Sequence, residues 1–153
     1  MTTQEVINKT MENARAYTKR YLDAMPADGY DFKPSPGTRS FAQQMLHLAD
    51  ANYYFISVAS GKPSPIGQVS AEQTIAPTKE ATTKAVMESY DYVINALSEI
   101  TPDQLKETVK YGDLEIPKAA AFGKTFEHQA HHRGQTAIYL RLKGVIPPEG
   151  VIF

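Results

Sequence analysis

The chain has 153 residues, of which 16 are Lys or Arg and 17 are Asp or Glu, so its formal net charge is −1. This length predicts a single domain over residues 1–153. The balanced charge, without a Lys/Arg run, argues against a nucleic-acid partner. The sequence contains no cysteine, which excludes disulfides, cysteine-containing zinc sites and a thiol nucleophile of the protein's own.

The N-terminal segment 1–22 interleaves apolar and charged residues, unlike the continuous apolar core of a signal peptide or membrane span. We therefore expect a soluble, cytoplasmic protein without a membrane partner. Thr2 and Glu5 form a capping-box pattern, in which each side chain accepts a hydrogen bond from the other residue's backbone amide. Apolar residues at helical spacing follow, so the sequence predicts a first helix that ends before Pro26.

A second helix is predicted after Ser40, because Gln43 completes another capping box and an apolar stripe follows. Gly61 and Pro63 are expected to end this helix. A third helix is predicted after the cap Thr78, with apolar residues at the heptad spacing of a bundle seam. These residues are Val86, Tyr90, Val93, Leu97 and Ile100.

The fourth predicted helix starts near Pro117, runs to about Leu142 and stops at Lys143-Gly144. Between the second and third helices, residues 59–78 show no clear periodicity, although a helix hairpin needs only about two to eight residues. An extended segment of this length can return along the whole bundle. We therefore predict an all-α four-helix bundle with up-down-down-up topology and a long crossover. The alternative is that this segment is a flexible insertion in an up-down-up-down bundle.

The four histidines suggest a metal site, because three lie in EHQAHHRGQ and the fourth, His47, lies on the second predicted helix. His128 and His132 are four residues apart and so share one helix face, like the two ligands of a helical metal clip. His47 shares a mostly apolar stripe with Ala51, Tyr54 and Val58, so it is expected to face inward and to supply a third ligand from a neighbouring helix. Three imidazoles with an open position suit a divalent borderline metal. Buried histidines that are merely hydrogen-bonded are the alternative.

Residues near these histidines restrict the chemistry. His131 projects about 100° away from His132 and is expected to lie outside the ligand set or on the surface. Gln129 stands where the zinc-protease signature has its glutamate, which disfavours a protease. Asp50, three residues after His47, is a candidate acceptor for an imidazole N–H, with a solvated carboxylate as the alternative.

The strings HQAHHRGQTAIYLRLKGVIPP and YDFKPSPGTRSFAQQMLHLA resemble the DinB family, also called DinB/YfiT-like, and the similarity covers essentially the whole chain. The resemblance implies a four-helix bundle of up-down-down-up topology and a divalent zinc or nickel ion bound by three histidines. By match these are His47, His128 and His132. It also implies a homodimer, since family members commonly form one. Some relatives are transferases or isomerases that depend on low-molecular-weight thiols.

These observations give three hypotheses for function. The first is a metal-dependent transferase or hydrolase that activates water or a thiol cosubstrate to attack a small-molecule substrate. The sequence identifies no catalytic residue or general base beyond the ligands. The second is a non-catalytic metal-binding or stress-response bundle. The third is a structural dimer with an empty histidine cluster.

The homodimer is also suggested by a second apolar stripe on the fourth predicted helix, on a different face from the histidines. The stripe consists of Phe122, Phe126, Ala130, Ala137 and Leu140. The alternative is that this stripe belongs to the intramolecular core.

Overall fold

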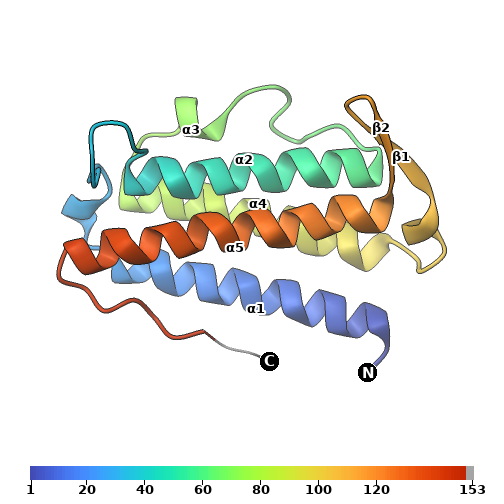
Figure 1. The fold of residues 1–153 in the computed structure, drawn as a ribbon, viewed down its shortest axis with the longest axis horizontal. Coiled ribbons are helices and arrows are strands. Elements are labelled where there is room, and N and C mark those ends of the chain that lie inside the picture. The colour runs from blue at the N-terminus through green and yellow to red at the C-terminus, as the bar shows by residue number, and fades with distance from the viewer. Residues whose placement is uncertain (151–153) are drawn as a thin grey trace.

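The computed structural model describes residues 1–150 and consists mainly of four long helices that lie side by side (Figure 1). They are α1 (Thr3–Ala24), α2 (Phe41–Ser60), α4 (Lys79–Glu99) and α5 (Lys118–Leu142). The connections contain the short helix α3 (Ala71–Thr74) and two 3-10 turns (Ala27–Gly29 and Gln104–Lys106). A hairpin of β1 (Thr108–Tyr111) and β2 (Leu114–Pro117) precedes α5.

The helices end where local chemistry predicts. The Thr2 and Ser40 capping boxes are both formed, and the Thr78 hydroxyl accepts from the Ala81 amide. Gly61 ends α2 with φ of 70°, in the left-handed region that glycine tolerates without strain. The predicted boundaries of all four helices are therefore confirmed to within a few residues.

Helix α2 packs against α4 and α5, and α1 packs against the same two helices on the other side. Asn52 donates to Ser89 over 3.0 Å, and the Ser57 and Tyr92 hydroxyls lie 3.3 Å apart. Because both pairs advance along the chain together, α2 and α4 run in the same direction. Helices α1 and α5 run in the opposite direction, and the segment between α2 and α4 returns along the bundle (Figure 1).

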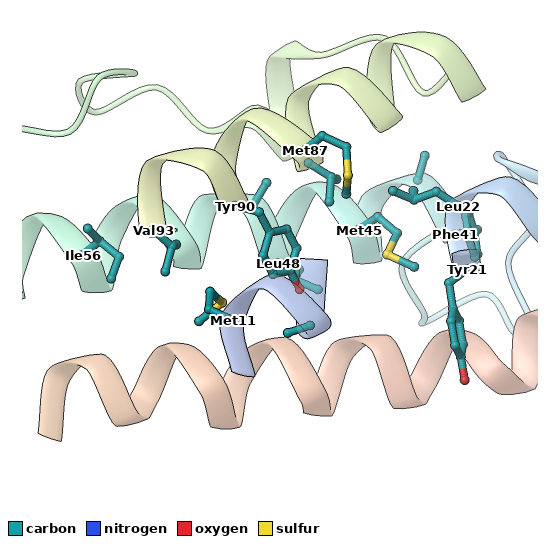
Figure 2. Close-up of a cluster of buried hydrophobic side chains, with 14 of the residues drawn as sticks. Met11, Tyr21, Leu22, Phe41, Met45, Leu48, Ile56, Met87, Tyr90 and Val93 are labelled. Atoms are coloured by element: carbon teal, nitrogen blue, oxygen red, sulfur yellow. The ribbon is translucent and has the colours of Figure 1, made fainter. Parts of the chain in front are cut away.

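The core fills the space between the four helices, with apolar side chains from α1, α2 and α4 meeting in its centre (Figure 2). The largest buried side chains are Tyr30, Tyr90, Phe41, Met11, Leu22, Met25, Met45, Leu46, Leu48, Ile56, Leu97 and Leu140. Within residues 1–150, no helix is both long and apolar enough to cross a membrane.

The sequence did not predict the β1–β2 hairpin, so the predicted all-α fold class is wrong in this respect. Val109 pairs with Ile116 across the two strands, and both side chains pack against the core. Gly112 in the connecting turn has φ of 60°, as tight hairpin turns require. Alternating apolar and polar residues on both sides of Gly112-Asp113 are the signal that could have found it.

The second apolar stripe on α5 faces the inside of the bundle. Phe122 and Leu140 are buried in the core, and Phe126 and Ala137 pack against it, while Ala130 is exposed. Four of the five residues of the stripe therefore belong to the intramolecular core or pack against it, so the stripe does not support a dimer. The homodimer itself stays a prediction.

Candidate metal centre

The structure brings together the three histidines that the sequence singles out. His47 comes from α2, and His128 and His132 come from consecutive turns of α5, which packs against α2. One ring nitrogen of each histidine can be chosen so that all three lie within 4.8 Å of one another. The ring centroids are 4.3 to 5.1 Å apart. His131 is exposed and lies outside this group, as predicted.

His132 is the most deeply buried of the three and has a fixed partner. Its Nδ1 lies 2.7 Å from Oε1 of Gln44 on α2. Because an amide oxygen can only accept, Nδ1 carries the proton and Nε2 keeps its lone pair. That Nε2 lies 3.1 Å from Nε2 of His128, so the lone pair is directed toward the other imidazoles. This is the tautomer that a metal ligand requires.

Gln44 is held in turn by residues that sequence reasoning did not assign to the site. Its Nε2 donates to Gln135 Oε1 over 2.7 Å and to the Tyr139 hydroxyl over 3.3 Å. Gln135 Nε2 lies 2.6 Å from Nε2 of His131. The glutamine of the HRGQ segment therefore connects exposed His131 to buried His132 through Gln44. Gln44 could not be found from spacing, because its contact with His132 joins two helices that are neighbours in the structure but far apart in the sequence.

His47 lies at the edge of the bundle. Its stripe was predicted to face inward, but Tyr54 on that stripe is 52% exposed and the His47 side chain is 29% exposed. Its Nδ1 lies 3.2 Å from Oε2 of Glu72 on α3. The other oxygen of Glu72 accepts from Arg39 Nε over 2.7 Å. Neither Arg39 nor Glu72 was assigned a role from the sequence.

Asp50 accepts hydrogen bonds from residues of the crossover between α2 and α4. Its carboxylate accepts from the Ser70 hydroxyl over 2.7 Å and from the Ala71 and Glu72 amides over 2.6 and 3.1 Å. It therefore caps the N-terminus of α3, which has no side-chain cap of its own. Asp50 was a candidate acceptor for an imidazole N–H, with a solvated carboxylate as the alternative, and its hydrogen bonds go to the crossover instead.

Gln129 points to a different part of the core from the histidines. It is buried, and its Oε1 accepts from the Tyr90 hydroxyl over 2.8 Å and from Arg133. This network ties α5 to α4. The residue that replaces the protease glutamate therefore has a structural partner, which agrees with the argument against a protease.

Burial keeps the three imidazoles neutral at neutral pH. Loss of hydration and the neighbouring His47 lower the pKa of His128 to about 4. Loss of hydration and the neighbouring His128 and His47 lower the pKa of His132 to about 3. Burial and the Arg39 guanidinium also lower the pKa of His47, although Glu72 opposes this shift. The lone pairs are therefore available to a cation without competition from protons.

Hydrogen bonds alone do not account for the cluster. His128 Nδ1 is buried and has no hydrogen-bond partner among the described residues. A histidine buried only for structure is expected to have both ring nitrogens paired. A divalent cation shared by three imidazole nitrogens fits this donor set, because one ion supplies a partner to all three and compensates the lost hydration of the buried nitrogens.

Two cavities lie beside the histidines. One, of about 300 Å³, is lined by Phe55, Lys124, Glu127, His128 and His131, and so gives direct access to a candidate ligand. The other, of about 730 Å³, is lined by residues that include Gln44 and Glu72, which contact His132 and His47. Both volumes are in the range that accommodates small molecules.

The lowered pKa values predict that the metal-free protein loses stability as the pH falls. Between about pH 6.5 and pH 3, the unfolded chain binds protons at His128 and His132 that the folded chain does not bind. The free energy of unfolding should therefore decrease steadily as the pH falls through this window. Urea unfolding of metal-free protein at several pH values measures it. A His132→Gln variant should show a shallower decrease, and an identical slope would contradict the prediction.

Comparison with known proteins places the chain in a wider group that shares its fold. The sequence pattern of the DinB superfamily matches residues 10–136. The uncharacterized protein YjoA of Bacillus subtilis is 25% identical over 142 residues, which cover 85% of this chain and 84% of YjoA.

Crystal structures of related proteins share the fold. A DinB-like protein from Bacillus cereus has a TM-score of 0.81 at 17% identity, with 96% of this chain and 97% of that chain covered. The YjoA structure has a TM-score of 0.76 at 19% identity, with 95% and 96% covered. A conserved protein from Enterococcus faecalis has a TM-score of 0.76 at 16% identity, with 93% and 97% covered. The matched segment 10–136 contains His47, His128 and His132, and the chain belongs to the DinB superfamily.

Proposed function

We propose that the protein is a metal-dependent enzyme in which His47, His128 and His132 bind one divalent ion, zinc or nickel. The reaction proposed is a transfer or hydrolysis in which a small nucleophile, a thiol cosubstrate or water, attacks an electrophilic small molecule. The observation that carries this proposal is the convergence of three neutral imidazoles beside a cavity that reaches His128. Such a site suits catalysis because three protein ligands leave a coordination position open.

The chemistry follows from the charge of the site. A divalent ion with three neutral ligands keeps its positive charge and lowers the pKa of a water or thiol bound to it. The chain has no cysteine, so the sulfur of any thiol reaction belongs to a cosubstrate. Gln44 keeps the His132 proton on Nδ1, so that Nε2 remains available as a ligand.

The proposal includes the up-down-down-up bundle topology. It is supported by the shared direction of α2 and α4, which follows from the Asn52–Ser89 and Ser57–Tyr92 hydrogen bonds. In such a bundle the crossover passes along α2 and carries α3 toward the end that holds His47.

The test is to incubate the metal-loaded protein with panels of low-molecular-weight thiols and electrophiles. We expect at least one pair of thiol and electrophile to react faster with this protein than with the His132→Ala variant. That variant lacks one of the three proposed metal ligands, the most buried of the group. Incubation with the electrophiles alone, without a thiol, tests water as the nucleophile. Equal rates for both proteins across the panel, together with bound metal that exogenous ligands cannot reach, would contradict catalysis. That outcome would leave a non-catalytic metal-binding bundle.

A further inference from the structure

The crossover between α2 and α4 is anchored at one place beside the histidines. Asp50 on α2 accepts three hydrogen bonds, from the Ser70 hydroxyl and from the Ala71 and Glu72 amides. A helix as short as α3 has little stability of its own, so this external cap fixes where it starts. The anchoring also fixes the backbone of Glu72, the second residue of α3.

The Glu72 carboxylate lies between the Arg39 guanidinium and the His47 imidazole. Its Oε1 accepts from Arg39 Nε over 2.7 Å, and its Oε2 lies 3.2 Å from His47 Nδ1. The carboxylate is only 19% exposed, so its interactions are less screened by water than those of a surface pair. Nη2 of Arg39 lies 3.4 Å from the same His47 Nδ1 and could donate to it only if that nitrogen carried a lone pair. The Glu72 carboxylate lies closer to Nδ1, at 3.2 Å, and can only accept, so it favours the tautomer with the proton on Nδ1.

The three imidazoles differ in what holds their second nitrogen. His132 has the neutral amide oxygen of Gln44, and His128 Nδ1 has no partner among the described residues. His47 alone has a carboxylate. A carboxylate that accepts the second N–H of a metal-bound histidine fixes its tautomer and makes the ring a stronger donor.

We propose that Glu72 is a positioning residue for the metal centre, which holds His47 with its proton on Nδ1 and its Nε2 directed toward His128 and His132. Asp50 supports this role by fixing α3. The long crossover thus has a function: it brings a carboxylate to the one histidine that lies at the edge of the bundle. This inference rests on the metal site of the proposed function, but not on any reaction.

The test compares Glu72→Gln with wild type in competition between the protein and a chromophoric chelator for Zn²⁺. We expect the affinity to fall by about 10- to 100-fold, the range found when a carboxylate partner of a metal ligand is removed. Glu12→Gln is the matched control, because it removes the same charge from an exposed site on α1. Asp50→Asn, which weakens the cap of α3 but keeps the carboxylate of Glu72, should lower the affinity less.

The absorption bands of the Co²⁺-loaded proteins separate positioning from coordination. In Glu72→Gln we expect their intensity to indicate the same coordination number as in wild type, with the bands shifted. A change of coordination number would show that Glu72 is itself a ligand and would overturn the proposal. An unchanged Zn²⁺ affinity in Glu72→Gln, or an equal loss in the control Glu12→Gln, would also overturn it. Failure of the wild type to bind Zn²⁺ would instead contradict the proposed function.

Discussion

Replacing His132 by alanine should reduce metal binding more than any other single substitution in the site. His132 is 6% exposed, and its ring centroid lies 4.3 Å from that of His128 and 4.6 Å from that of His47. Loss of the outer partner of a ligand alone costs about 10- to 100-fold in affinity, so loss of the ligand itself should cost more. The measurement is the Zn²⁺ dissociation constant of the purified variant.

The same experiment has an internal control on the same helix. His131→Ala also removes an imidazole from α5, but His131 is exposed and lies outside the three-histidine group. It should therefore retain metal, whereas His47→Ala and His128→Ala should lose most of it. Circular dichroism of the metal-free variants checks that each remains folded. Normal metal loading in any of the three ligand variants would contradict the assignment.

Replacing Phe41 by alanine should cause a large loss of stability. Phe41 is fully buried at the start of α2, and its ring packs edge-on against Tyr30 at 5.1 Å. Truncation of a buried phenylalanine costs about 3–5 kcal/mol. A domain of this kind is stable by only about 5–15 kcal/mol, so this is a large fraction of the total. Urea unfolding of the metal-free protein measures the change.

The control for Phe41→Ala is Ile138→Ala, which removes an apolar side chain that is 55% exposed. It should change the free energy of unfolding by no more than about 0.5 kcal/mol, as for most surface substitutions. Saturating Zn²⁺ should stabilise both variants, by about 2.7 kcal/mol when the free ion is at 100 times its dissociation constant. A loss in Phe41→Ala no larger than that in Ile138→Ala would contradict the place of Phe41 in the core.

The helices could be predicted because their signals are local. Ser40 and Gln43 are three residues apart, Gly61 directly follows α2, and the pair His128 and His132 lies on one helix. A capping box or a helical repeat depends only on near neighbours, so the sequence contains the whole pattern. His47 could be added because its helix and the general bundle architecture were both predictable.

The partners of the histidines could not be predicted in the same way. Gln44 meets His132 across two helices, and Glu72 reaches His47 from a crossover without periodicity. Such contacts depend on how the helices are rotated and shifted against one another, which spacing within one segment does not determine. The exposure of Tyr54 on the His47 stripe has the same origin. The hairpin was missed for another reason, because its strands have only four residues each and give a short alternating pattern.

The proposed binding of one divalent ion by three histidines is tested most directly by diffraction from metal-loaded crystals at the absorption edge of the metal. We predict one anomalous peak per chain, within bonding distance of one nitrogen each of His47, His128 and His132, with no fourth protein ligand. Nitrogens that lie within 4.8 Å of one another in the structure need only small side-chain movements to reach this arrangement. A peak bound by other residues, or no peak in crystals grown with excess Zn²⁺ or Ni²⁺, would contradict the claim.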